Sequence, residues 1–235
     1  MQLTGYHRER RHEPPPPRTQ GLDNIPPVHA STPHTYQRLL DRLHRNTSVL
    51  VSDGSLNPDL HIGSAAFVWA ADNNHLDICV GQIITPGEPD IHCPHRSELS
   101  GLLSGILYIN KVCTTHNITE GHITIGCDGL GAISSCSNLY EVVNSTRKHF
   151  DLIRAIGTAI NNSPLTWTFE HVKAHQDDTK EFHDLSFLEK LNVYADTYAK
   201  QKLQDFTSTQ AWQNRIPTRV YLEPCTILIE QSNGH

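Results

Sequence analysis

Four carboxylates lie beside apolar segments in a pattern that suits metal-ion chemistry. Asp53 and Asp128 follow strand-like runs, whereas Glu98 and Asp196 lie on helix-like runs. A carboxylate near an apolar core costs free energy unless a metal ion or another cation neutralises it. Carboxylate oxygens suit Mg²⁺ or Mn²⁺, and two such ions about 4 Å apart can activate a water and stabilise the leaving oxygen of a phosphodiester. The four acids therefore predict a site for phosphodiester hydrolysis with two metal ions.

The two acids that follow strands also have ordinary structural explanations. Asp53 precedes Gly54, and an Asp-Gly pair after a strand is a common turn signal. We expect Asp53 to project from the end of its strand. Asp128 ends the apolar run 123–127 and precedes a helix-like segment, so it is also a candidate N-cap.

Glu98 lies on the apolar side of its predicted helix. At helical spacing it is in line with Leu102, Gly105 and Ile109, so it extends the apolar stripe and should face the core. A core-facing acid needs a partner. The alternative is that Glu98 only favours the positive end of the helix dipole.

The local sequence around Asp196 says least about whether the residue binds a metal ion. It sits one turn before Lys200 on the last predicted helix, so an exposed ion pair with that lysine is an alternative to a metal-binding role. Its inclusion in the site depends on the presence of the other three acids.

The elements that would position the acids alternate between strands and helices. Alternating apolar residues predict strands, and apolar residues three and four apart predict helices. In chain order we expect strands at 48–51, 63–70 and 76–81 with a turn at 72–74, a helix at 97–112, a strand at 123–127, helices at 130–135 and 146–160, a strand at 165–172 and a helix at 186–203. This order predicts an α/β fold in which helices pack on the faces of a mixed sheet.

The sequence predicts one folded domain between two flanking segments. Residues 1–45 are rich in Pro, His and Arg, and we expect a flexible segment that ends in a short helix. Residues 46–204 form the expected domain. Residues 205–235 form a C-terminal extension, which carries one further candidate strand at 226–229.

Charge and cysteine usage narrow the class of protein. The net charge of -6 argues against binding nucleic acid by general basicity, because phosphate affinity comes mainly from Lys and Arg. Six cysteines form no C-x-x-C pair and no apolar leader precedes them, so we expect reduced thiols in an intracellular protein, nuclear or cytoplasmic, that is not secreted. Cys79, Cys113 and Cys127 fall in apolar runs and are expected in the core. No run reaches the length of a membrane span.

Five segments together resemble the type 1 ribonuclease H domain, including the versions fused to reverse transcriptases in retroelements. The resemblance covers roughly residues 47–204, with the same order, element type and approximate spacing. It rests on the segments Ser52–Ser55, Arg96–Leu99, Cys127–Asp128, His171–His175 and Asn192–Ala199. It implies a ribonuclease-H-like five-stranded mixed sheet flanked by helices.

The resemblance also implies a site and a substrate. Asp53, Glu98, Asp128 and Asp196 match the family's catalytic acids, which bind two Mg²⁺ ions or Mn²⁺, and His175 matches a mobile loop histidine that helps proton transfer or product release. The implied substrate is RNA in an RNA–DNA hybrid, recognised through 2′-hydroxyls and backbone shape. Endonucleolytic cleavage would leave a 5′ phosphate and a 3′ hydroxyl. An upstream reverse transcriptase domain is a candidate partner that could supply hybrid affinity.

Three local features depart from that pattern or compete with it. The stretch after His175 is long, which makes His183 an alternative for the loop histidine. The region 138–148 supplies only Arg147 and Lys148, so there is no clearly basic helix for holding the hybrid. The segment 92–95, His-Cys-Pro-His, lacks a second ligand pair at usable spacing, so we interpret it as a loop rather than a zinc site.

Two other functions remain open at this point. One is a catalytically inactive ribonuclease-H-like binding module. The other is a nuclease of the transposase, integrase or junction-resolvase type, which would act on DNA. Retention of all four acids favours an active enzyme over a decayed one, and the combination of His175 with Asp196 fits the DNA-acting families less well.

Overall fold

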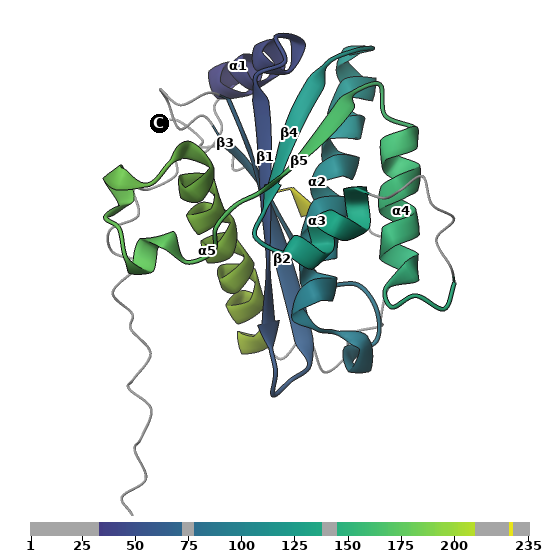
Figure 1. Ribbon diagram of the computed structural model, residues 1–235, viewed down its shortest axis with the longest axis vertical. Coiled ribbons are helices and arrows are strands. Elements are labelled where there is room, and N and C mark those ends of the chain that lie inside the picture. Colours follow the sequence, from purple (N-terminus) through teal and green to yellow (C-terminus); the bar gives the residue numbers. More distant parts are fainter. Residues whose placement is uncertain (1–32, 72–77, 138–144, 210–225, 228–235) are drawn as a thin grey trace, which may run out of the picture.

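A mixed β-sheet forms the centre of the computed structural model, which describes residues 33–71, 78–137, 145–209 and 226–227 (Figure 1). Its strands are β1 (Ser48–Asn57), β2 (Ile62–Ala70), β3 (Ile78–Ile84), β4 (His122–Cys127), β5 (Thr166–His171) and the two-residue β6 (Thr226–Ile227). They lie in the order β5-β4-β1-β2-β3-β6. β1, β2 and β3 are antiparallel neighbours, β4 is parallel to β1, and β5 is parallel to β4.

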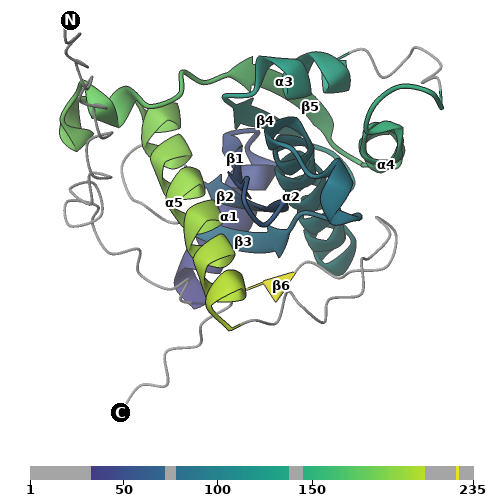
Figure 2. The same ribbon diagram turned by 90° about the horizontal axis from the view of Figure 1, so that it is seen from below.

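Helices cover both faces of the sheet. They are α1 (Pro33–His44), α2 (Pro94–His116), α3 (Leu130–Ser137), α4 (Phe150–Asn161) and α5 (Phe187–Ser208). Figure 2 shows α5 on one side of the sheet, with α2 and α4 on the other. The five-stranded mixed sheet flanked by helices that the sequence predicts is therefore confirmed, with β6 as a short addition at the β3 edge.

The alternation of side chains along the central strands builds a core on each face. Leu50 of β1 faces the larger cluster with α2, and its neighbour Val51 faces a smaller cluster with α5. In β2, Trp69 faces the larger cluster and Val68 the smaller one. Every residue of β2 is buried. A strand covered on both faces loses the polar alternation of a solvated one, which explains the continuous apolar run of β2.

The expectation that β1 ends before Asp53 is wrong. The strand continues to Asn57, and Asp53 pairs with Ala66 in the middle of the antiparallel ladder. Gly54 is needed for close packing rather than for a turn, since a Cβ at this position would lie 2.6 Å from the backbone nitrogen of Glu98. The strand instead ends before the reversal at 58–61, where His61 adopts a left-handed φ of 51°.

Parts of the flanking segments can be placed. α1 is the short helix expected near the end of the first segment, and it buries Leu39, Leu40 and Leu43 in the larger core. β6 falls within the strand expected at 226–229. Residues 1–32 and the turn expected at 72–74 lie outside the described residues, and the domain boundaries at 45 and 204 stay predictions. In the part of the chain that the structure describes, no helix is both long enough and apolar enough to cross a bilayer.

Candidate active site

Asp53 lies at the centre of the four acids. Its side chain is 5% exposed, and one carboxylate oxygen accepts a hydrogen bond from the Gly54 backbone at 2.6 Å. Burial, reinforced by the negative charges of Glu98, Asp128 and Asp196, raises the pKa of Asp53 to about 9. The fold therefore brings the other three acids within electrostatic reach of the buried Asp53 carboxyl.

Glu98 faces the sheet from the first turns of α2, as its place in the apolar stripe predicts. Leu102 and Ile109 further along that stripe are fully buried. Burial and the nearby charge of Asp128 raise the pKa of Glu98 to about 7, although a hydrogen bond from the Cys127 thiol at 3.2 Å partly opposes the rise. Both causes of the rise disfavour the ionised carboxylate unless a cation is present.

A buried arginine anchors the start of α2, which carries Glu98. Arg96 is 2% exposed and donates hydrogen bonds of 2.9 and 2.6 Å to the two carboxylate oxygens of Asp151, in the first turn of α4. Its Nε donates to the Pro86 carbonyl at 2.8 Å. The adjacent Ser97 hydroxyl donates to the Ser55 carbonyl of β1 at 3.1 Å. These bonds tie α2 to both α4 and β1, so they fix the position of Glu98.

Asp128 follows β4 and lies beside β1 because the two strands are parallel neighbours. The preceding residue, Cys127, pairs with Ser52, which places Asp128 next to Asp53. Burial raises the pKa of Asp128, and the charge of His175 opposes that rise. Its Oδ1 is buried and has no hydrogen-bond partner among the described residues. That oxygen does not cap α3, so it is available to a ligand.

Asp196 combines the two roles that the sequence left open. Its Oδ2 lies 2.6 Å from Lys200 Nζ, which is the i,i+4 ion pair, and its side chain is 25% exposed. Its charge also contributes to the raised pKa values of Asp53 and Asp128. For Lys200, burial lowers the pKa, but the hydrogen bond and charge of Asp196, with the charge of Asp53, outweigh it and the pKa is raised. Lys200 is therefore a cation within the acidic site.

Two histidines approach the acids, and one of them was not predicted. His175 is exposed, has a left-handed φ of 52°, and precedes the short helix η3 (Gln176–Asp178). His171 ends β5 beside Cys127, and the charges of both histidines oppose the rise that burial causes in the pKa of Asp128. His183 lies in the short helix η4 (Phe182–Asp184), with its side chain 80% exposed and 3.4 Å from Asp184. The structure thus brings His175 rather than His183 towards the acids.

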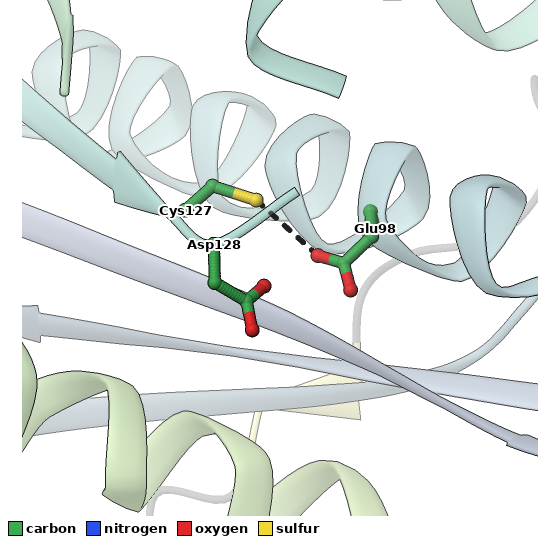
Figure 3. Close-up of side chains that lie close together, drawn as sticks. All are labelled: Glu98, Cys127 and Asp128. Carbon is green, nitrogen blue, oxygen red and sulfur yellow. Dashed lines mark hydrogen bonds between the residues drawn. The ribbon is translucent and has the colours of Figure 1, made fainter. Parts of the chain in front are cut away.

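Cys127 was expected only as a core residue, and it is buried, as are Cys79 and Cys113. Its thiol also points towards Glu98 from the end of β4 (Figure 3). One donor atom each from Glu98, Cys127 and Asp128 lies within 4.8 Å of the others. No local pattern predicts this contact, because only the placement of α2 across β4 brings the thiol to the carboxylate.

The segment 92–95 runs into the first turn of α2, which begins at Pro94, so the expected loop covers only His92 and Cys93. The His92 Nδ1 accepts a hydrogen bond from the Gly63 backbone at 3.0 Å, and its Nε2 bonds the Gly87 carbonyl at 3.1 Å. Both ring nitrogens are engaged, so His92 is a structural link between β2 and the loop.

The donor set fits divalent cations. Four carboxylates converge, and three of them have pKa values raised by burial and by one another. Positive charge placed among them would remove the repulsion and let all four ionise. All of these donors are oxygens, the donor type that Mg²⁺ and Mn²⁺ prefer.

Comparison with solved structures finds ribonuclease H domains. The N-terminal RNase H domain of Rv2228c from Mycobacterium tuberculosis matches with a TM-score of 0.45 and 12% identity, over 69% of this chain and 97% of that one. The foamy viral protease–reverse transcriptase bound to an RNA/DNA hybrid matches with a TM-score of 0.43 and 17% identity, over 67% of this chain and 20% of that one. RNase H1 from the archaeon Halobacterium salinarum matches with a TM-score of 0.43 and 11% identity, over 67% of this chain and 98% of that one.

The structure resembles ribonuclease H domains. No protein-family model and no curated protein matches the sequence. At these identities and TM-scores the solved structures say nothing about activity, so we base the function on the strand order and the site geometry of this chain.

Proposed function

We propose that the protein is a metal-dependent endonuclease of the ribonuclease H type, which cleaves the RNA strand of RNA–DNA hybrids. The observation that carries this proposal is the carboxyl of Asp53, whose pKa is raised by burial and then by the charges of three further acids from separate elements. Clustered carboxylates with perturbed pKa values typically mark functional sites. Burying carboxylates that repel one another costs free energy, and a bound cation would offset that cost.

Asp53, Glu98, Asp128 and Asp196 would together hold two Mg²⁺ ions, or Mn²⁺ in their place. When bound, the ions supply activation of a water and stabilisation of the leaving 3′ oxygen. The protein's own residues orient the acids. The Arg96–Asp151 pair holds the start of α2, and Gly54 lets Glu98 approach β1, so the acids are oriented before substrate arrives.

The neighbouring side chains offer proton transfer and charge balance. His175 is exposed beside Asp128, where its imidazole can exchange a proton with water or with the departing product. Lys200 holds one oxygen of Asp196 at 2.6 Å. It must give up that contact if Asp196 is to bind an ion with both oxygens.

The proposed substrate follows from the resemblance of the five sequence segments and from charge. A net charge of -6 supplies little general affinity for phosphate, so the ions and local contacts must position the strand. Recognition of an RNA strand through its 2′-hydroxyls suits such a surface. We further propose that the chain is of retroelement origin and that an upstream reverse transcriptase domain is its partner. That domain would supply the affinity for the hybrid that this chain lacks.

A panel of substrates tests this function. The purified chain is incubated with a labelled RNA–DNA hybrid, double-stranded DNA or single-stranded RNA, each with Mg²⁺, Mn²⁺ or EDTA. We expect loss of the hybrid's RNA strand alone, in either metal and not in EDTA. Cleavage of DNA would instead favour the transposase and integrase class, and metal-independent cleavage would contradict the site.

The Lys200–Asp196 pair favours one second candidate, a catalytically inactive binding module. A lysine that permanently neutralises a metal-binding acid would replace a cation rather than accompany it. Hybrid binding without cleavage in either metal, by a protein with a normal circular dichroism spectrum, would support this candidate over the enzyme.

A further inference from the structure

Cys127 places a thiol inside the acidic site. The side chain is fully buried, its Sγ donates to Glu98 Oε2 at 3.2 Å, and the Gly129 backbone donates to the sulfur at 3.4 Å. Figure 3 shows the sulfur directed from the end of β4 towards the carboxylate of Glu98, with the Asp128 carboxylate on the adjoining residue. The sulfur therefore belongs to the same cluster of donor atoms as two of the acids.

The spacing of these atoms suits a single ion. The donor atoms of Glu98, Cys127 and Asp128 all lie within 4.8 Å of one another. Ligand atoms around one tetrahedral Zn²⁺ at about 2.0–2.3 Å lie about 3.3–3.8 Å apart. Cys127 Sγ and Glu98 Oε2, at 3.2 Å, are already close to that spacing, so the Asp128 carboxylate needs to move inwards by no more than about 1–1.5 Å. Asp128 also has a buried Oδ1 without a hydrogen-bond partner among the described residues. It can join an ion without losing an existing contact.

Sulfur changes which metal such a site prefers. Mg²⁺ and Mn²⁺ favour oxygen, whereas Zn²⁺ binds thiolate and carboxylate together and often has three protein ligands with one open position. Two carboxylates and one thiolate form such a set. Asp53 and Asp196 lie outside this group of three.

We propose that Glu98, Cys127 and Asp128 form a thiophilic metal site within the acidic cluster, which takes one Zn²⁺ ion and thereby inhibits the enzyme. On binding, the thiol proton leaves to solvent as the sulfur–metal bond forms, and the hydrogen bond to Glu98 is lost without any redox change. Inhibition follows because the ion occupies two of the four carboxylates, and this part rests on the proposed function. The binding of the ion does not.

Cadmium is the probe for binding, because it forms an ultraviolet charge-transfer band with thiolate. The full chain is titrated with Cd²⁺ without substrate, beside the variants Cys127→Ser, Cys93→Ser and Cys113→Ser. Cys93 is the competing partly buried thiol, 3.4 Å from His149 Nε2. Cys113 is a buried thiol four turns from Glu98, about 22 Å along α2 at 1.5 Å per residue.

We expect one tight band in the wild type and in the Cys93 and Cys113 variants, and its loss in Cys127→Ser. A band that persists in Cys127→Ser, or that disappears in Cys93→Ser, overturns the site. If Cys127→Ser does not fold by circular dichroism, Glu98→Gln decides, since it keeps the thiol. Loss of that ligand should weaken Cd²⁺ binding at least about tenfold, and an unchanged affinity overturns the proposal.

Inhibition is measured separately, as the Zn²⁺ concentration that halves Mg²⁺-dependent cleavage of the hybrid's RNA strand. The rate of each protein is expressed relative to its own rate without Zn²⁺. The Zn²⁺ concentration for half inhibition should be at least about tenfold higher in Cys127→Ser than in the wild type. Equal sensitivity of the wild type and Cys127→Ser overturns the inhibitory role. Absence of any cleavage in Mg²⁺ contradicts the proposed function, whereas the cadmium result then still decides the metal site.

Discussion

Asp53 contributes to the pH dependence of the free energy of unfolding of the metal-free protein. Its pKa is about 9 in the folded chain, from burial and from three nearby acids, against an ordinary value near 4 in the unfolded chain. Between these values the folded state keeps a proton that the unfolded state has released. The free energy of unfolding therefore falls as the pH rises from about 4 to about 9, and the full stability is present only below that window.

The variant Asp53→Asn tests this linkage. It removes the titrating group, so in EDTA its melting temperature should exceed that of the wild type at about pH 8 and should fall less steeply from about pH 5. A gain on the order of 1 kcal/mol corresponds to about 3 °C for a chain of this size. Parallel melting curves of the two proteins across this range would contradict the assigned pKa.

Lys200 should weaken metal binding by competing for Asp196. In Lys200→Gln, Asp196 loses the cation bound to it, so the affinity for Mn²⁺ should rise a few-fold. This is less than about 1 kcal/mol, because the lysine side chain is 55% exposed and its ion pair is screened by solvent. Isothermal titration calorimetry measures the change. Lys111→Gln, at an exposed position on α2, is the matched control. Weaker Mn²⁺ binding by the Lys200 variant would mean that the lysine supports the site.

The acids were predictable residue by residue, whereas two of their neighbours were not. Asp53, Glu98 and Asp128 stand out because each interrupts or ends an apolar run, and Asp196 gains its meaning from them. Cys127 and His171 look like ordinary strand residues, and only the alignment of β4 with β5 and α2 places them beside the carboxylates.

At the scale of the elements, the close approach of β1 and α2 is the feature that the site depends on most. Gly54→Ala would place a methyl group 2.6 Å from the Glu98 backbone nitrogen and 2.7 Å from Ser97, both at the start of α2. Backbone atoms cannot move aside as a flexible side chain can. We expect a loss of roughly 1–3 kcal/mol in the free energy of unfolding, together with lower metal affinity, because Glu98 is displaced.

Gly131→Ala is the matched control for that change. Its added Cβ would meet His95 at 3.4 Å, an ordinary contact, and the position lies in α3, where alanine favours the helix. Urea unfolding and Mn²⁺ titration of both variants separate the two cases. Equal effects of the two substitutions would show that the contact between β1 and α2 does not position Glu98.

Periodicity found the elements, but it misjudged where two strands end, since β3 was expected to stop at residue 81 and continues to Ile84. The apolar run of β1 stops at Val51, whereas the strand continues to Asn57 because β2 offers it a partner along that whole length. Such pairing is a long-range contact that a local pattern does not contain. The last helix begins at Phe187, next to the start expected at Ser186, and there Ser186 and Glu189 form a complete capping box.

At the scale of the whole molecule, the packed core includes residues that precede the predicted domain. α1 buries Leu39 and Leu43 completely against the face of the sheet that α2 also covers. Leu43→Ala should therefore cost about 2–5 kcal/mol of stability in denaturant unfolding. Leu107→Ala, at a residue that is 46% exposed on α2, should change stability by about 0.5 kcal/mol or less. A similarly small effect at Leu43 would show that α1 is not part of the folded unit.

We propose that four acids from β1, α2, the end of β4 and α5 form one metal-dependent nuclease site. The most direct test is the rate of RNA-strand cleavage in a labelled RNA–DNA hybrid with Mg²⁺, compared between the wild type, Asp53→Asn and the exposed control Asp59→Asn. We predict metal-dependent cleavage by the wild type and by Asp59→Asn, and a loss of at least about a hundredfold in folded Asp53→Asn. Undiminished cleavage by Asp53→Asn would contradict the assignment.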